Sequence, residues 1–359
     1  MLKENNVHIT AKIKGVEYIP FLGRDLKEYD FNEFDKALDN DATFILNLNE
    51  KNKIAVSWWV SAKRTRSYPY SRVYDSLDFS SKKITIIPIF KDEGKEGDRD
   101  YLQWDTISLM SLLGVYVIIA YYNDAVQSSR YDQKITSQRF DIKYLNENIT
   151  KLRSYQSDAL HWNIAQIDRI GEIGDKAIKS YKQISENTGV EMHSLKAAKK
   201  RINNLREGKE SFMELSRNLA ELAQRREQIT EQPKELLNGI KGTITITNYL
   251  GGNYYFTSDE VELHGEDIYL IDAKHTRKNN IPSLGDIKDG LLKMMLFTNL
   301  SDVKINGKNV KPVAVLKLTT GDEFSIEELS STYKKRIEIL KKEASVNGFK
   351  ILLNSEYLC

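Results

Sequence analysis

The sequence has a single cysteine, Cys359, and five histidines among its 359 residues. One cysteine excludes a disulfide framework and a cysteine-rich zinc site. The histidines do not have the spacing of zinc ligands either. They are His8, His161, His193, His264 and His275. With so few soft metal ligands and no disulfide, we expect a protein of a reducing cytoplasm.

Long apolar runs are also absent. The most apolar run, Leu112 to Tyr122, has about half of the roughly 20 residues that a bilayer crossing needs, and we interpret it as a buried strand. The first residues, Met1 to Asn6, lack the apolar core of a signal peptide. We therefore expect a protein that is neither exported nor anchored.

Several catalytic motifs are missing as well. No Gly-x-x-x-x-Gly-Lys-Ser/Thr phosphate loop and no Gly-x-Ser-x-Gly elbow occurs. The formal net charge is only +2, so any affinity for nucleic acid has to come from local basic patches. The composition, 40% hydrophobic and 29% charged, is ordinary for a globular chain long enough for two domains.

Two strand-like runs stand out in the C-terminal part. One extends from Tyr254 to Leu263 and the other from Ile268 to Ala273, with Gly265-Glu266-Asp267 as a hairpin turn between them. Alternation along a strand places Asp272 and Lys274 on one face. The hairpin brings Asp259 across from Asp272.

Two neighbouring carboxylates form a hard oxygen site that suits Mg²⁺, which binds one or two carboxylates together with water and phosphate oxygens. Such a metal activates water and stabilises charge on a phosphate, while Lys274 adds positive charge and helps to position or deprotonate the attacking water. The alternative is a solvated ion pair at a strand end, because Asp-x-Lys triplets are common by chance.

The order of elements favours the catalytic interpretation. A helical stretch from about Ser211 to Leu237 precedes three strands, of which the first covers Thr243 to Tyr249. An amphipathic helix from about Leu284 to Leu300 and a strand from Pro312 to Thr319 follow. The predicted order is helix, three strands, helix, strand.

With these elements, the segment of about residues 210 to 320 resembles the PD-(D/E)xK nuclease superfamily, and especially type II restriction endonucleases. Ser258-Asp259 stands at the "PD" position, with serine in place of proline, and Asp272-Ala273-Lys274 stands at the "(D/E)xK" position. The resemblance implies that Asp259 and Asp272 bind the metal and that Lys274 is the lysine of the motif.

Further residues are candidates for auxiliary roles. Glu260 or Glu262 could supplement or replace Asp259, and the resemblance implies a glutamate from the preceding helix, either Glu231 or Glu235. Lys293, on the helix after the triplet, is a possible auxiliary residue, although an ordinary solvated lysine is the alternative. Lys288 on the same helix, and His275 and Arg277 just after the triplet, are further candidates for phosphate contacts.

Residues 1–150 predict a separate α/β domain. Lys83 to Phe90 and Val115 to Tyr122 are expected to be strands of a parallel pair, and Leu102 to Leu113 the helix that covers them. Between them is a glycine-punctuated acidic loop, which we interpret as solvated because basic residues alternate with its acids; metal binding is the alternative. The acids considered as candidate ligands are Asp92, Glu93, Asp98 and Asp100, with Asp105 following in the helix.

The same domain has a run from Lys63 to Tyr74 that combines four basic residues with three tyrosines and no acid. Arginines suit phosphates and guanine edges, so Arg64, Arg66 and Arg72 are candidate DNA contacts. The alternative is a surface hairpin whose arginines pair with the acidic loop.

A third segment, residues 178–206, resembles a helix-turn-helix. Gly189 stands at the turn, Ser194 could cap the second helix, and Ile184, Val190, Leu195 and Ile202 occupy the positions where two helices meet. The second helix has five basic residues and no acid, which predicts a positive face for phosphates. They are Lys196, Lys199, Lys200, Arg201 and Arg206. Any helical hairpin with a glycine turn imitates this pattern.

The sequence thus predicts a mixed α/β (α+β) chain in three parts: an N-terminal domain (1–150), a helical connector (151–208) and a nuclease-like domain (209–359). We expect a type II restriction endonuclease that uses Mg²⁺ to cut double-stranded DNA and acts as a homodimer, because a symmetric site is most simply read by a two-fold symmetric protein. The resemblance also implies a cognate DNA methyltransferase. The alternatives are another DNA nuclease of the superfamily (repair, phage or transposon) and a non-catalytic DNA-binding regulator.

Overall fold

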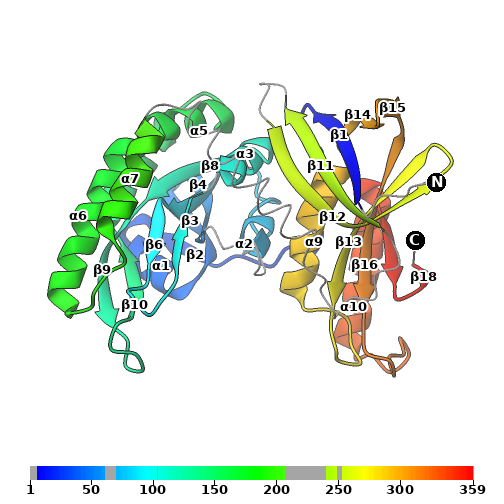
Figure 1. The fold of residues 1–359 in the computed structure, drawn as a ribbon. Helices are drawn as coiled ribbons and strands as arrows, with labels where there is room; N and C mark the ends of the chain where they lie inside the picture. Colours follow the sequence, from blue (N-terminus) through cyan, green and yellow to red (C-terminus); the bar gives the residue numbers. More distant parts are fainter. Residues whose placement is uncertain (1–5, 61–69, 103, 207–239, 249–252, 359) are drawn as a thin grey trace. The chain divides into compact units, whose positions relative to one another are not determined.

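The computed structural model describes residues 6–60, 70–102, 104–206, 240–248 and 253–358. The chain divides into two compact units (Figure 1). Unit 1 comprises Met1–Arg24 and Arg217–Cys359, and unit 2 comprises Asp25–Ser216. The structure therefore groups the first residues with the C-terminal part of the chain, and the helices expected as a connector with unit 2. The expected boundary at residue 208 lies outside the described residues.

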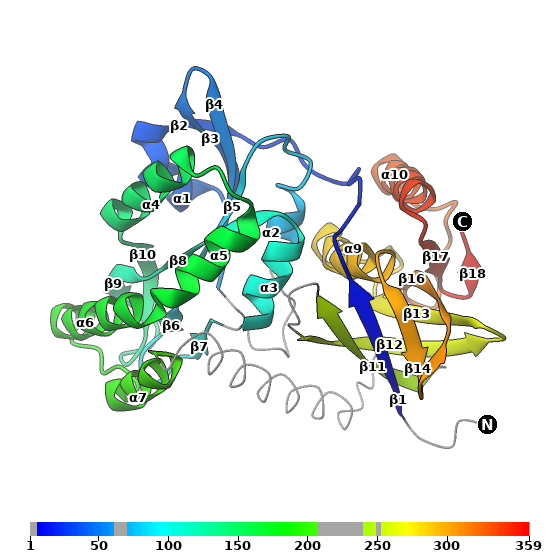
Figure 2. The same ribbon diagram turned by 90° about the horizontal axis from the view of Figure 1, so that it is seen from above.

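Unit 1 is built on a nine-stranded sheet with the strand order β15-β14-β1-β11-β12-β13-β16-β17-β18. Its strands are β1 (Asn6–Ile13), β11 (Ile240–Asn248), β12 (Asn253–His264), β13 (Asp267–His275), β14 (Ser301–Ile305), β15 (Lys308–Asn309), β16 (Lys311–Thr319), β17 (Lys350–Leu353) and β18 (Glu356–Tyr357). Its described helices are α9 (Leu284–Phe297) and α10 (Ser331–Asn347). Helix α9 packs on β13 and β16 and α10 on β17, and Figure 2 shows both helices on the same side of the sheet.

The strands expected around the candidate site are present. β11, β12 and β13 are successive antiparallel neighbours, and β16 is parallel to β13 after the α9 crossover. Ser283 caps α9, because its hydroxyl accepts a hydrogen bond from the Asp286 amide at 3.2 Å. The expected apolar stripe of α9 is buried, as predicted. It consists of Ile287, Leu291, Met294 and Met295. The helix expected before β11, Ser211 to Leu237, lies outside the described residues.

Strand β1 lies between β11 and β14, although more than 230 residues separate it from β11 in the chain. It pairs in parallel with β11, from Asn6 opposite Lys241 to Ile13 opposite Asn248. Its alternate residues Val7, Ile9, Ala11 and Ile13 are buried in the core. The N-terminal segment is therefore an integral part of the sheet that carries the candidate site.

Unit 2 contains a five-stranded sheet with the order β2-β3-β4-β5-β8 and two two-stranded sheets, β9 with β10 and β6 with β7. Its strands are β2 (Glu28–Asp30), β3 (Thr43–Asn49), β4 (Asn52–Trp58), β5 (Lys83–Pro88), β6 (Phe90–Asp92), β7 (Arg99–Tyr101), β8 (Val115–Ala120), β9 (Tyr122–Gln127) and β10 (Ile135–Phe140). Its helices are η1 (Phe31–Glu33), α1 (Phe34–Asn40), α2 (Tyr70–Tyr74), α3 (Trp104–Leu112), α4 (Ile142–Ser154), α5 (Ala159–Asp168), α6 (Ile170–Thr188) and α7 (Leu195–Arg206).

The parallel pair predicted in this unit is formed by β5 and β8, and α3 packs on β8. Helix α5 covers the outer edge of β8 with side-chain hydrogen bonds. Asn163 accepts from the Val117 amide at 2.7 Å and donates to the Val115 carbonyl at 3.0 Å, while Trp162 donates to the Val117 carbonyl at 2.7 Å. These bonds satisfy backbone groups that an open strand edge leaves unpaired.

The structure is thus a mixed α/β fold, as the sequence predicts. Within the described residues, no helix combines the length and the apolar character that a membrane crossing requires.

Candidate active site

Strand β13 carries the candidate triplet, and its alternation places Asp272 and Lys274 on the face that contacts α9. The Asp272 side chain is fully buried, with 0% of its surface exposed. The Lys274 ammonium lies 3.1 Å from Oδ2 of Asp272, with 16% of its side chain exposed. The pair is therefore in the interior of the unit, and the alternative of a solvated ion pair does not describe it.

Strand β12 brings Asp259 to the same place. Glu260 pairs with Ile271 in the antiparallel register, so the next pair along the two strands is Asp259 opposite Asp272. One Asp259 carboxylate oxygen, Oδ2, accepts a hydrogen bond from the Ala273 amide at 2.8 Å. The three residues chosen from the sequence, Asp259, Asp272 and Lys274, are therefore neighbours in space.

Helix α9 adds two charged side chains to this cluster. Asp289 accepts a hydrogen bond from the Lys274 ammonium at 2.8 Å. The Lys293 ammonium, one helical turn further along, contacts Oδ1 of Asp272. Lys274 therefore lies between two carboxylates, and Asp272 lies between two ammonium groups.

Gly290 allows the helix to come this close. A Cβ atom at Gly290 would be 2.6 Å from Cδ1 of Leu316 and 3.1 Å from Oδ2 of Asp272. Such distances are too short for a side chain without movement of the neighbours. Glycine at this position lets α9 bring Asp289 and Lys293 to β13.

The electrostatics of the two carboxylates differ. Burial raises the pKa of Asp259 to about 7, and the negative charge of Asp272 adds to this effect, against Lys293 and Lys274. Burial also opposes the charge of Asp272, but Lys274 and Lys293 outweigh it and lower the pKa of Asp272 to about 2. Asp272 is therefore ionised at neutral pH, whereas Asp259 exchanges its proton near neutrality.

Both lysines keep their protons. Burial opposes the charge of Lys274, yet Asp272 and Asp289 outweigh it and raise the pKa of Lys274 above its ordinary value. The pKa of Lys293 is raised in the same way, against burial, mainly by Asp272 and Asp259. In this arrangement both side chains act as cations.

The candidate glutamates do not join the cluster. Glu260 points to the opposite face of the sheet, where its carboxylate forms a buried ion pair with Lys317 at 2.5 Å. Glu262 follows on the same side as Glu260, and its carboxylate lies 3.0 Å from His264. Strand alternation therefore separates both from Asp272. Glu231 and Glu235 lie outside the described residues.

Of the acids expected to bind a metal, Asp259 and Asp272 remain, while the third carboxylate of the cluster, Asp289, is bonded to the Lys274 ammonium. No cluster of three or more histidine, cysteine, aspartate or glutamate residues able to hold a metal occurs in the described ranges. Two carboxylates nevertheless fit Mg²⁺, which completes its shell with water and substrate oxygens. Asp259 and Asp272 are the residues that would hold it.

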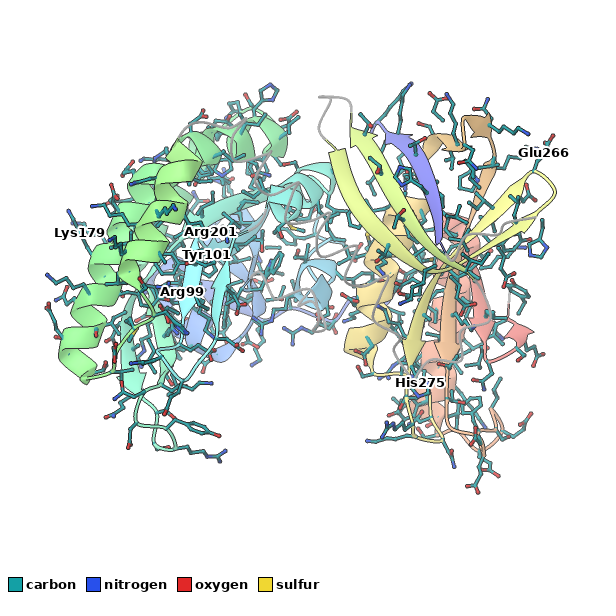
Figure 3. The ribbon with its side chains drawn as sticks, viewed as in Figure 1. Arg99, Tyr101, Lys179, Arg201, Glu266 and His275 are labelled. Atoms are coloured by element: carbon teal, nitrogen blue, oxygen red, sulfur yellow. The ribbon has the colours of Figure 1, made fainter. Side chains whose placement is uncertain are left out.

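The remaining candidates in the C-terminal part of the chain are His275, Arg277 and Lys288. Nδ1 of His275 lies 2.9 Å from the Thr319 hydroxyl on the neighbouring strand. Figure 3 shows His275 at the end of β13 opposite to Glu266, which lies in the hairpin turn. Arg277 is exposed, and Lys288 is buried with 3% of its surface exposed. Of these residues, only Arg277 has the exposure that a phosphate contact needs.

Sequence reasoning missed Asp289. Its signal was present, because Asp289 and Lys293 are four residues apart and therefore lie on the same side of α9 as Gly290. A helix face that combines an acid, a glycine and a lysine next to an apolar stripe indicates a polar contact with the sheet.

In unit 2, the basic candidates divide into packed and exposed side chains. Arg72 donates a hydrogen bond to the Trp58 carbonyl at 2.7 Å, with its guanidinium 4.7 Å from the Trp58 ring centre. The Arg201 guanidinium lies 4.3 Å from the ring centre of Tyr101. Three lysines of α7 are exposed: Lys196, Lys199 and Lys200. Arg64 and Arg66 lie outside the described residues.

The helix-turn-helix-like segment consists of the long helix α6, six connecting residues and α7. Gly189 ends α6 with a φ of 70°, and the Ser194 hydroxyl accepts a hydrogen bond from the Ala197 amide at 3.2 Å, as expected of a cap. Ile184, Val190 and Ile202 are buried where the helices meet. Whether this hairpin reads DNA stays a prediction.

The acidic loop differs from the expectation of a solvated loop at Asp92. This carboxylate is fully buried and lies 2.7 Å from both the Arg99 guanidinium and the His193 ring. Arg99 in turn donates hydrogen bonds to the His193 and Ser194 carbonyls, directly before α7. The alternation of charges along the loop could not predict that Asp92 is buried, because the partners of Asp92 come from β7 and from the α6–α7 connection. The loop fixes the start of α7.

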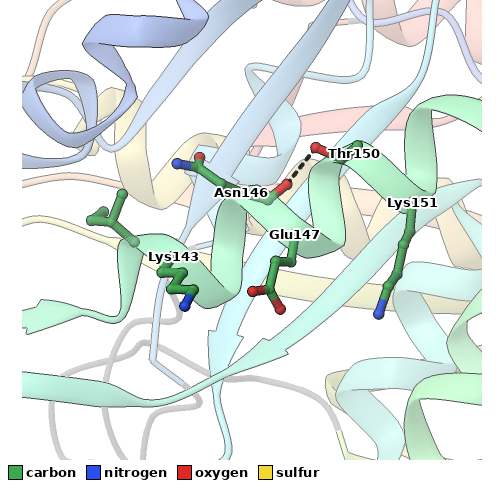
Figure 4. Close-up of a pocket in the computed structure, with 6 residues that line it drawn as sticks. Lys143, Asn146, Glu147, Thr150 and Lys151 are labelled. Carbon is green, nitrogen blue, oxygen red and sulfur yellow. Dashed lines mark hydrogen bonds between the residues drawn. The ribbon is translucent and has the colours of Figure 1, made fainter.

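Unit 2 also has a surface hollow along one side of α4 (Figure 4). Its lining comes entirely from this helix, and the Thr150 hydroxyl donates to the Asn146 carbonyl at 2.8 Å. The lining residues are Ile142, Lys143, Asn146, Glu147, Thr150 and Lys151. One helix face without convergent groups from a second element does not form a catalytic site.

Comparison with known proteins gives no match: no family model, no curated protein and no solved structure is similar to this chain. The function of the candidate site therefore has to be inferred from its own geometry and chemistry.

Proposed function

We propose that this protein is a metal-dependent endonuclease that hydrolyses phosphodiester bonds of double-stranded DNA, in the manner of a type II restriction endonuclease. The observation that carries the proposal is the buried cluster in which Asp259 and Asp272, from adjacent strands, meet Lys274. The strand order from β11 to β16 supports the resemblance to the PD-(D/E)xK superfamily that the sequence suggested.

Each residue has a role that follows from its surroundings. Asp272 supplies a permanent negative charge and Asp259 a second carboxylate that is available once it loses its proton. Asp259 and Asp272 would hold Mg²⁺, which would polarise the phosphate and lower the pKa of the attacking water. Lys274 is held as a cation, so it contributes positive charge toward the phosphate and orients the nucleophile. Asp289 fixes the position of the Lys274 ammonium.

Lys293 is a further part of this machinery, because its ammonium contacts the carboxylate that would hold the metal. With a metal held by Asp272, Lys293 would be available to contact a phosphate oxygen. The homodimer and a cognate DNA methyltransferase belong to the same proposal, since a restriction enzyme requires protection of the host's own sites.

One observation favours a second candidate, a non-catalytic DNA-binding protein. Lys274 and Lys293 together already balance the charges of Asp272 and Asp289, so the cluster is a complete ion-pair network without a metal. A buried network of this kind can simply fix the packing of α9 on the sheet.

Digestion of unmethylated phage DNA separates these functions. The chain is incubated with Mg²⁺ or with Ca²⁺, and wild type is compared with Asp272→Ala and Lys274→Ala. Glu266→Gln and Lys308→Ala, which change exposed side chains of the same unit, are the controls. A restriction enzyme gives discrete fragments with Mg²⁺ in the wild type and the controls but not in the two site variants.

The other outcomes are equally specific. A smear that depends on both site residues indicates a nuclease without site specificity, such as a repair, phage or transposon enzyme. No cutting with any divalent metal overturns the enzymatic proposal and leaves the DNA-binding protein.

A further inference from the structure

Helix α7 presents a surface of unpaired positive charge. Lys196, Lys199 and Lys200 are exposed, and none of them has an ion-pair or hydrogen-bond partner among the described residues. On the preceding helix two lysines are paired, because Lys176 bonds to Glu172 at 2.8 Å and Lys182 lies 3.9 Å from Glu186, whereas Lys179 is exposed. We call Lys196, Lys199 and Lys200 the α7 lysine surface.

The opposite side of α7 is firmly packed. Ala198 and Ile202 are buried. A Cβ atom at Gly174 of α6 would be only 2.5 Å from Ile202, so the two helices are in close contact. At its beginning, α7 is held through Arg99 and the fully buried Asp92. The three lysines therefore project from a helix whose position is fixed.

Arg201 of this helix is not part of the surface. Figure 3 shows Arg201 next to Tyr101, and its guanidinium lies 4.3 Å from the ring centre. Burial lowers the pKa of Arg201 relative to its ordinary value. Arginine reads guanine with a rigid fork of N–H groups that donates to both O6 and N7 of the base. The α7 lysine surface instead offers separate point charges on flexible stems.

We propose that the α7 lysine surface binds the phosphate backbone of double-stranded DNA without reading its sequence. This inference takes its ligand from the proposed function. The lysines span about 6 Å of helix axis, at 1.5 Å per residue, which covers neighbouring phosphates of one strand. A membrane surface fits less well, because the exposed large apolar side chains of the described residues include none on α7.

The test measures binding by fluorescence anisotropy, with the full chain, without divalent metal, over a series of salt concentrations. The ligands are two labelled duplexes of equal length and unrelated sequence. Wild type is compared with the triple variant K196Q/K199Q/K200Q and with the control K308Q/K311Q/K335Q. The control removes the same charge from exposed lysines outside α6 and α7.

The slope of log affinity against log salt is negative, and each lost phosphate contact reduces its magnitude by about 0.9. The α7 triple variant should therefore reduce the magnitude of the slope by between about 2 and 3. It should weaken the binding of both duplexes by the same factor. The control should keep the wild-type slope. Single substitutions should each give about one third of the effect, which separates lost contacts from a folding defect.

Three results of the DNA titration overturn the inference: an unchanged slope in the α7 variant, an equal loss in the control, or a loss confined to one duplex, which indicates base reading. Binding to vesicles with anionic lipid that depends on the same lysines, without binding to DNA, also overturns it. The binding test contains no metal, so its result does not depend on cutting. A chain that binds DNA in this way but fails to cut in the separate digestion with Mg²⁺ contradicts the proposed nuclease and leaves this inference standing.

Discussion

The Lys293 ammonium contacts the Asp272 carboxylate and thereby joins helix α9 to strand β13 through a fully buried charge. A divalent cation at Asp272 has to compete with this ammonium. The same contact that joins helix and strand in the metal-free unit would therefore weaken the proposed metal binding.

Replacing Lys293 by methionine should tighten the binding of a divalent metal, because Asp272 loses a competing cation while the apolar part of the side chain is kept. An increase of about tenfold corresponds to about 1.4 kcal/mol. Calorimetric titration with Ca²⁺ measures the affinity without turnover, and Lys308→Met is the matched exposed control. Unchanged or weaker Ca²⁺ binding would contradict this role of Lys293.

The pH dependence of stability should reveal Asp259. Its pKa is about 7 in the folded chain and 3.8 in the ordinary state, so the folded chain retains a proton that the unfolded chain releases. The associated stabilisation is complete below pH 4 and is lost as the pH rises to 7. Asp272 has the opposite shift, and its contribution is lost only as the pH falls from about 4 to about 2.

Asp259→Asn should therefore stabilise the metal-free chain relative to wild type at pH 8 and have little effect at pH 5. The expected gain at pH 8 is at least about 1.4 kcal/mol, the equivalent of one pKa unit. Thermal unfolding in EDTA at the two pH values tests this. An equal effect of the substitution at both pH values would show that Asp259 does not carry the shifted proton.

Gly290→Ala should destabilise unit 1 by about 1 to 3 kcal/mol, because the added methyl group overlaps Leu316 and Asp272. Gly285→Ala is the matched control in the first turn of the same helix, where the nearest atom to the new Cβ lies 3.7 Å away. Urea unfolding should show a loss for the first variant and none for the second. Equal stability of the two variants would mean that α9 is less closely packed than described.

Asp92→Ala should destabilise unit 2 by about 3 to 5 kcal/mol, since it leaves the Arg99 charge without its buried partner. Glu191→Gln removes an exposed ion pair with Lys95 nearby and should cost less than about 1 kcal/mol. Denaturant unfolding followed by circular dichroism gives both values. A small loss for Asp92→Ala would show that the pair is accessible to water.

Local patterns were sufficient to predict the central part of the site. Alternation along β13 placed Asp272 and Lys274 on one face, and the turn around Gly265, which has a φ of 65°, set Asp259 across from them. Both inferences depend only on residues within about 15 positions of one another. The apolar stripe of α9 was predictable for the same reason.

The other contacts of the charged residues could not be predicted, because no local sequence pattern encodes them. The meeting of Lys293 with Asp272 requires the rotation of α9 about its axis and its close approach at Gly290. Glu260 was a plausible ligand by distance along the chain, and only the register with β13 and β16 shows its partner to be Lys317. The partners of Asp92 come from residues up to 101 positions away.

The position of β1 between β11 and β14 has a consequence for the order in which the protein can fold. All of unit 2 is encoded between β1 and its parallel partner β11. During synthesis, unit 2 can therefore complete its own core while Val7, Ile9 and Ile13 still have no sheet to join. Until the ribosome has made the last third of the chain, this apolar strand has to be kept from pairing with a strand of another nascent molecule.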